Sequence, residues 1–253
     1  LNEGGSGADT YRLGNGADTL TGGETAESGD GHTIDGGALT DVYVINSVQN
    51  SFLGGNASDT QFINFEVIRG DAAGTANLVN QTESLTVAGS AGNDTVVLGS
   101  GVYNLDGDMG NDTVTGGATV TVADTLHGGA GVDTLNLTDD TAATDLNSVS
   151  GFEFINIVNT NASAYTTLDT LLAAGATLTV TQTGNQNLTF NGTAETNGAF
   201  VFSTSGGPDA LTGGAGNDVF DSGTGNDSLV GGAGDDVFTF NTAGDIDLSD
   251  VVN

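Results

Sequence analysis

The chain has 253 residues, a length that allows one large domain or two small ones. It carries 33 acidic residues against two arginines, and its net charge of -31 disfavours nucleic acid or an anionic membrane surface as a partner. Without cysteine it can form neither a disulfide nor a cysteine-based zinc site, so stacking and bound ions must stabilise the fold.

Short glycine-rich repeats open the chain. Residues 4–12 read GGSGADTYR and residues 13–21 read LGNGADTLT, which share the pattern G-G-x-G-x-D-x-U-x, where U is large and apolar. Asp9 and Asp18 occupy the acidic position of these units, and a degraded third unit has Glu27 there. Residues 1–45 are therefore predicted to form a block of N-terminal repeats.

A second cluster lies in the middle of the chain. SAGNDTVV and GDMGNDTVT place Asp94 and Asp112 eighteen residues apart, and the half-turn between them has Tyr103 where an acid would stand. A later unit, GGAGVDTLN, carries Asp133 three residues out of that register, which indicates an insertion. Residues 46–138 are predicted to be a β-solenoid that contains these central repeats.

Segments of strand character lie between the clusters. VYVI from Val42, FEFINIV from Phe152 and AFVF from Ala199 are rich in β-branched and aromatic residues and are bounded by turn-forming residues. YTTLDTLLAAG, residues 165–175, predicts one short helix that a glycine ends, inserted at the side of the solenoid. Residues 139–203 are thus predicted to be a β-rich segment with a short helix.

The C-terminal part holds the most regular array. TSGGPDALT, GGAGNDVFD, SGTGNDSLV and GGAGDDVFT follow one another from Thr204. Their acids, Asp209, Asp218, Asp227 and Asp236, stand nine residues apart, and a large apolar residue follows two positions after each. Nine residues then form one turn and one strand, and eighteen form a full coil. Residues 204–253 are predicted to be this array.

The turns have the chemistry of a calcium site. Ca²⁺ prefers six to eight oxygen ligands, and a glycine-rich turn offers backbone carbonyls beside the carboxylate of its aspartate. Stacked coils bring like acids together, and two carboxylates about 4 Å apart repel by roughly 4 kcal/mol at an effective dielectric near 20. We therefore expect a chain that binds several Ca²⁺ ions and that is disordered without calcium and folded with it.

The nonapeptides resemble the RTX (repeats-in-toxin) family, whose members are exported by type I secretion. The resemblance implies an all-β, right-handed parallel β-roll or β-helix solenoid with an ion between turns eighteen residues apart. It also implies that the earlier turn supplies its second and fourth carbonyls and its aspartate, and the later turn its first and third carbonyls and its aspartate. The implied ligand sets are Ser90, Gly92 and Asp94 with Gly107, Met109 and Asp112; Ser205, Gly207 and Asp209 with Ser222, Thr224 and Asp227; and Gly214, Gly216 and Asp218 with Gly231, Ala233 and Asp236. Asp9, Asp18 and Asp133 are further expected ligands without a complete set.

Three functional readings follow from these patterns. The first reading is an enzyme. Catalysis is disfavoured, because His32 and His127 are the only histidines and neither HExxH nor G-x-S-x-G occurs. The second reading is a calcium-folding carrier or secretion module of an exported enzyme or adhesin.

The third and preferred reading is a secreted structural protein. The modules of the type GGxGxDTLxL followed by GFExIxI resemble those of alphaproteobacterial S-layer proteins and large RTX surface proteins. This resemblance favours self-assembly into a surface layer, filament or adhesin stalk at the cell surface. Expected partners are other copies of the chain, as a homo-oligomer or open polymer, with a cell-surface polysaccharide as a further candidate.

Overall fold

The structure is a computed structural model. It describes residues 10–12, 15–21, 33–35, 38, 40–45, 62–63, 67–70, 73–79, 81–116, 120–138, 144–158, 160–241 and 250–253. In this part of the chain the regular elements are all strands, and every pairing between them is parallel. The predicted all-β parallel solenoid is confirmed.

The chain packs as two units, one of residues 1–115 with 128–131 and the other of residues 116–127 with 132–253. In the first unit, β2, β4, β6, β8 and β10 form one sheet, β7, β9 and β11 a second, and β1, β3 and β5 a third. The strands are β1 (Thr10–Arg12), β2 (Thr19–Thr21), β3 (Thr33–Asp35), β4 (Val42–Ile45), β5 (Phe62–Ile63), β6 (Val67–Gly70), β7 (Thr75–Asn77), β8 (Leu85–Ser90), β9 (Thr95–Val97), β10 (Tyr103–Asp108) and β11 (Thr113–Gly116).

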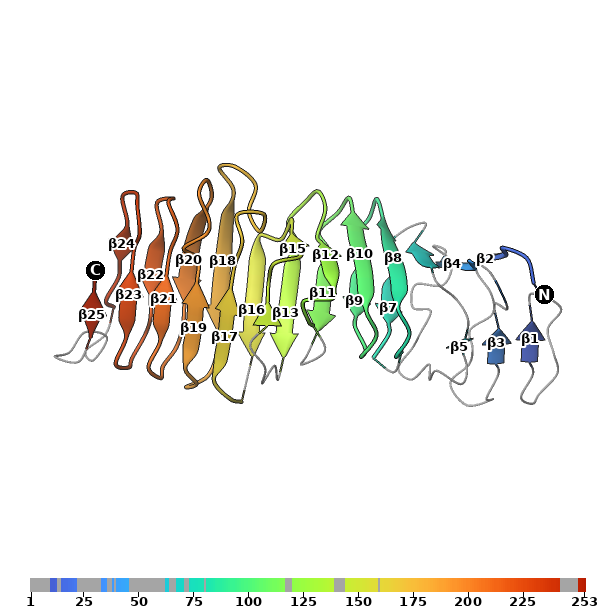
Figure 1. The fold of residues 1–253 in the computed structure, drawn as a ribbon, viewed down its shortest axis with the longest axis horizontal. Coiled ribbons are helices and arrows are strands. Elements are labelled where there is room, and N and C mark those ends of the chain that lie inside the picture. Colours follow the sequence, from blue (N-terminus) through green and yellow to red (C-terminus); the bar gives the residue numbers. More distant parts are fainter. Residues whose placement is uncertain are drawn as a thin grey trace. The chain divides into compact units, whose positions relative to one another are not determined.

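In the second unit consecutive strands alternate between two main sheets (Figure 1). One sheet has the order β24-β22-β20-β18-β16-β13, the other β14-β17-β19-β21-β23-β25, and β12 pairs with β15. The strands are β12 (Thr125–His127), β13 (Thr134–Thr138), β14 (Thr144–Asp145), β15 (Val149–Ser150), β16 (Phe154–Val158), β17 (Ser163–Thr166), β18 (Thr177–Gln182), β19 (Leu188–Asn191), β20 (Ala199–Ser203), β21 (Ala210–Thr212), β22 (Val219–Asp221), β23 (Ser228–Val230), β24 (Val237–Phe238) and β25 (Val251–Val252).

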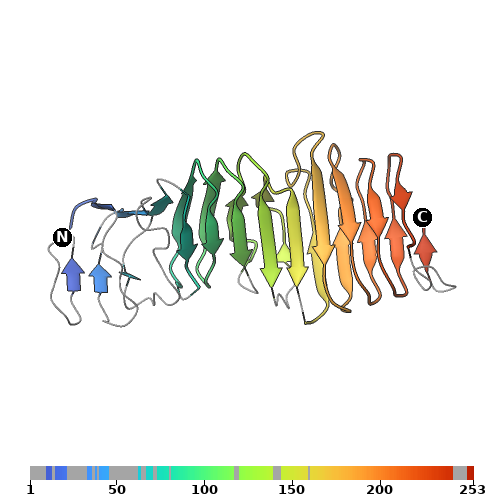
Figure 2. The ribbon, with the colours of Figure 1, turned by 180° about the vertical axis from the view of Figure 1, so that it is seen from behind.

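The register of these strands shows the length of a coil. Phe202 pairs with Phe220, and Leu211 pairs with Leu229, each across eighteen residues. Two nonapeptides therefore form one coil of the array, with one strand in each sheet. Figure 2 shows the same coils from behind, where the C-terminal strands again lie side by side.

The large apolar residue of each repeat packs inside the coil. Leu211, Phe220 and Leu229 have exposed fractions of 1 % or less, because side chains alternate inward and outward along a strand. The ring of Phe220 stacks on that of Phe202 at 5.1 Å and on that of Phe238 at 4.9 Å between centroids. Burial of the rings of Phe202 and Phe220 stabilises the fold by roughly 1.5–3 kcal/mol each.

The helix predicted at residues 165–175 is wrong. Ser163–Thr166 is β17, and the residues that follow form bends and single turns. The N–H groups of Thr167 and Gly175 donate to the carbonyls of Asn191 and Asn197 in the next coil instead of to a helical partner. Pairing with the neighbouring coil, together with burial of Leu171 and Leu172, overrides the helical propensity of this segment. In the described residues no helix is long enough to cross a membrane.

Candidate metal centre

The acid of each repeat lies where the turn enters the strand, and it joins two coils. Asp218 is fully buried just before β22, and its Oδ1 accepts a hydrogen bond of 2.6 Å from Phe200 N. In turn, the N–H of Asp218 donates to Oδ1 of Asp236 at 2.9 Å. Each carboxylate thus accepts from the backbone one coil earlier, which builds a ladder of acids along the stack.

The same contact recurs at the other predicted pairs. Asp94 N donates to Asp112 Oδ1 at 2.7 Å, and Asp209 N donates to Asp227 Oδ1 at 2.9 Å. Asp94, Asp112, Asp209 and Asp227 each have an exposed fraction of 7 % or less. The structure therefore brings together the acids of all three predicted ligand sets.

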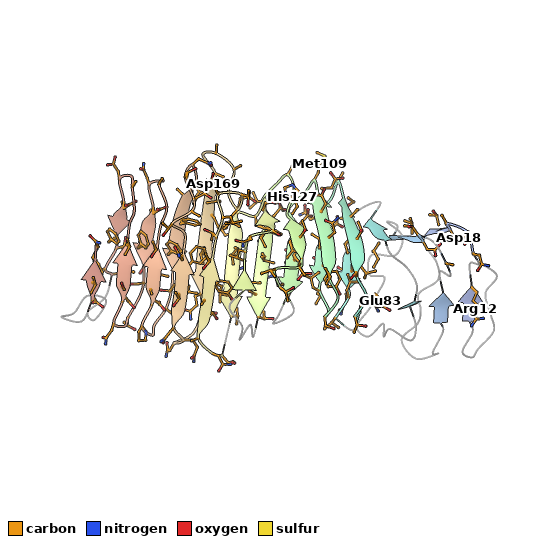
Figure 3. The ribbon with its side chains drawn as sticks, viewed as in Figure 1. Arg12, Asp18, Glu83, Met109, His127 and Asp169 are labelled. Atoms are coloured by element: carbon orange, nitrogen blue, oxygen red, sulfur yellow. The ribbon has the colours of Figure 1, made fainter. Side chains whose placement is uncertain are left out.

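Turn carbonyls point toward the following turn in these sets. Ser205 O accepts from Thr224 N at 3.1 Å, Gly214 O from Ala233 N at 3.0 Å, and Ser90 O from Met109 N at 3.1 Å. The carbonyls of Gly92, Gly207 and Gly216 also face the next turn, where a Cβ on the stacked glycine would meet them. Met109 lies at this turn end of the first unit (Figure 3).

The first position of a turn lies against the carboxylate of the same repeat. A Cβ on Gly213 would collide with Oδ2 of Asp218, and one on Gly231 would collide with Oδ2 of Asp236. Gly214 N donates to that same Oδ2 of Asp218 at 2.8 Å. At these two positions glycine leaves the carboxylate close to the turn backbone, so carboxylate and carbonyl oxygens gather in one place.

Burial disfavours the charged form of these acids. Loss of hydration raises the pKa of Asp209 to about 6, and the charge of Asp227 adds to the effect. The pKa of Asp218 is raised for the same first reason, with smaller contributions from Asp236 and Glu195. The second unit contains no lysine or arginine, since Arg12 and Arg69 both belong to the first. A cation is the counter-charge that these positions lack.

The available ligands fit Ca²⁺. Ser222 Oγ is buried without a hydrogen-bond partner in one predicted set, as is Asp18 Oδ2 near the N-terminus. The described residues contain no cluster of three or more His, Cys, Asp or Glu side chains. An ion here would thus be held by two carboxylates and by backbone carbonyls, which are the hard oxygen ligands that Ca²⁺ prefers.

The ladder continues at three residues that the sequence analysis did not assign as ligands, namely Asp41, Glu153 and Asp250. Asp18 N donates to Oδ1 of Asp41, Asp133 N to Oε2 of Glu153, and Asp227 N to Oδ1 of Asp250, at 2.7–2.8 Å. Their spacings of 23, 20 and 23 residues exceed the eighteen of a regular coil. A usable signal was the acid directly before an apolar strand, as in TDVYVI and SDVV. Asp9 lies outside the described residues.

Comparison with known families identifies the repeats. The model for the RTX calcium-binding nonapeptide repeat matches in 4 copies, over residues 3–31, 89–119, 123–140 and 203–238. A search of curated proteins found no match. The matched segments contain the acid pairs 94/112, 209/227 and 218/236 and the turns that carry them. The chain therefore carries RTX calcium-binding nonapeptide repeats in these four segments.

Proposed function

We propose that this chain is an extracellular structural protein that calcium folds and that assembles with copies of itself into a surface layer, filament or adhesin stalk. The ladder of buried acids is the observation that supports folding by calcium. In the second unit Asp209, Asp218 and Asp227 are 2 % exposed or less, and that unit has no lysine or arginine. RTX repeat proteins are calcium-binding and typically secreted, which supports an extracellular place of action.

The second unit offers a surface for assembly. In the described residues β24 and β25 are the outermost strands of their sheets, each paired on one side. Val237, Val251 and Val252 on these strands are 52 %, 57 % and 42 % exposed. An apolar strand edge with open N–H and C=O groups is a template for pairing with another strand. A second copy, stacked in the same direction, would continue both sheets and give an open polymer.

Electron microscopy of the purified chain tests this proposal. The chain would be imaged in millimolar calcium and again after chelation. We expect ordered sheets or filaments that disappear with the chelator. Particles that fold with calcium but stay dispersed would contradict self-assembly and favour the second candidate. That candidate is a carrier or secretion module, which the unbroken array from Thr204 to Thr239 favours.

We also propose that the chain is not an enzyme. His127, labelled in Figure 3, is exposed at the end of β12, and its Nδ1 lies 3.1 Å from Ser150 Oγ. No acid contacts this pair in the described hydrogen bonds, so it lacks the third group that orients a catalytic histidine. His32 lies outside the described residues.

A further inference from the structure

One turn outside the repeats stacks as the calcium turns do. Residues 192–198, GTAETNG, lie before the C-terminal segment that the family model matches, which begins at residue 203. Ala215 N donates to Glu195 O at 2.9 Å, as Ala233 N donates to Gly214 O at 3.0 Å one coil later. The carbonyl of Gly198 faces Gly216 closely, as that of Gly216 faces Gly234. The turn 192–198 thus sits on the turn 213–218 as that turn sits on 231–236.

The acid that a repeat would carry at the end of this turn is absent. Its place in the ladder is taken by Phe200, whose N–H donates to Asp218 Oδ1 at 2.6 Å. A different carboxylate enters the turn from Glu195, whose side chain has an exposed fraction of 0 %. The acid of this turn is therefore Glu195, whereas the position that is acidic in a repeat is occupied by Phe200.

The carboxylate of Glu195 is satisfied on one oxygen only. Oε1 accepts hydrogen bonds from Gly198 N at 3.0 Å and from Asn197 N at 3.2 Å, which fix its direction. Oε2 is buried and has no hydrogen-bond partner. An unpartnered carboxylate oxygen in the interior is costly unless a proton or a cation meets it.

Two other acids lie near the side chain of Glu195. Asp218 is fully buried, and its Oδ2 accepts a hydrogen bond from Gly214 N at 2.8 Å. A Cβ on Gly214 would lie 2.9 Å from the Cβ of Glu195, so the two acids flank the same glycine. Asp169, which is exposed, also interacts with Glu195, and its Oδ1 accepts a hydrogen bond from Thr196 N at 2.8 Å. Figure 3 shows Asp169 in the turn region at one end of the coils. Glu195 and Asp218 thus lie on stacked turns of a unit that has no lysine or arginine.

We propose that a further Ca²⁺ ion binds between the turns 192–198 and 213–218, with the carboxylates of Glu195 and Asp218 as its charged ligands. By equivalence with the next pair of turns, the carbonyl of Gly198 and those of Gly213 and Ala215 complete its oxygen ligands. The column of ions then extends one turn beyond the repeat pattern. This inference rests on calcium binding by the array and is independent of self-assembly.

Counting bound ions in the full chain tests the site. Native mass spectrometry at saturating calcium would compare the wild type, Glu195→Gln and Asp235→Asn. The glutamine keeps an acceptor for Gly198 N but loses the charge, and we expect one ion fewer. Asp235→Asn removes an equal charge from an exposed position that Asn217 and Asn226 fill in the neighbouring repeats, and its ion count should equal that of the wild type.

The outcomes separate this inference from the calcium proposal. A wild type that binds no calcium would end both, whereas equal ion counts in the wild type and Glu195→Gln would overturn this site alone. Should Glu195→Gln not fold, Glu195→Asp decides, because it keeps the charge on a shorter side chain. We then expect affinity for one ion to fall by about 10- to 100-fold. Unchanged affinity, or failure of this variant to fold in calcium while Asp235→Asn folds, would overturn the site.

Discussion

The backbone N–H of Asp209 donates a hydrogen bond of 2.9 Å to Oδ1 of Asp227, the residue that holds the same position one coil later. The carboxylate of Asp227 is thus an acceptor for the neighbouring coil, and we propose that it is also a charged ligand for Ca²⁺. These tasks can be separated by substitution, because asparagine retains the acceptor and removes the charge.

Asp227→Asn should change stability in opposite directions with and without calcium. In the calcium-free chain the variant should be at least as stable as the wild type, because repulsion with Asp209 is relieved. In saturating calcium it should be less stable, by about 1.5–3 kcal/mol, the range for loss of an interaction with a charged group. Urea unfolding followed by circular dichroism measures both values.

Asp227→Ala is the companion variant, since it removes the acceptor as well. It should be less stable than Asp227→Asn under both conditions, because Asp209 N loses its partner. Equal stabilities for the alanine and asparagine variants would contradict the role of this hydrogen bond.

Acid should promote folding of the calcium-free chain. Burial raises the pKa of Asp209 to about 6 in the fold, above the ordinary value of 3.8. A group whose pKa is higher in the folded state stabilises the fold fully below the unfolded value, and this contribution is lost as the pH rises through about 6. With chelator present, circular dichroism should show structure gained between pH 7 and pH 4 and lost again on return.

Calcium should reverse this dependence. Carboxylates must be deprotonated to bind the ion, so protons compete with Ca²⁺ and the calcium concentration needed for folding should rise as the pH falls. Asp209→Asn removes one of the titrating groups, and its calcium-free stability should vary less between pH 4 and 7. An identical pH profile for this variant would show that other acids carry the effect.

Chelation should unfold the repeats reversibly, and magnesium should not restore them. Mg²⁺ requires near-octahedral geometry and keeps much of its water, whereas ligands made of turn carbonyls and two carboxylates suit the larger ion. Far-UV circular dichroism and hydrodynamic radius would be followed during titration of the chelated chain with each metal. Equal refolding by both ions would argue against a site built for Ca²⁺.

The regular part of this architecture was predictable because two periods coincide in it. Phe220 and Leu229 stand in the apolar position of their repeats, and the structure buries both and pairs each with its equivalent eighteen residues away. A strand period of two inside a coil of eighteen fixes which residues face inward. The acids 94/112, 209/227 and 218/236 meet for the same reason.

The remaining acid contacts could not be predicted from the sequence, because insertions change the spacing between the acids. The partners of Asp18, Asp133 and Asp227 are 20 or 23 residues away, since extra residues lengthen a coil at its turns while the strands stay paired. A fixed spacing cannot find such partners. The segment after β17 was misjudged because propensity is local, whereas its N–H groups are taken by a coil that lies about 24 residues further along the chain.

Glycine in the turns should be required for contact between coils as well as for backbone conformation, and two glycines allow these causes to be separated. Gly232 has φ of +103°, and a Cβ there would collide with the carbonyl of Gly214 in the preceding turn. Gly175 has φ of +76°, but a Cβ there would meet nothing within 4 Å.

Gly175→Ala should therefore cost only the strain of the left-handed region, about 1–2 kcal/mol. Gly232→Ala bears a comparable strain and must also separate two stacked turns whose carbonyls are expected calcium ligands. We expect a clearly larger loss of stability in calcium and a higher calcium midpoint for folding, measured by circular dichroism during calcium titration. Equal losses in the two variants would mean that conformation alone selects glycine, and that the close approach of the turns contributes nothing to ion binding.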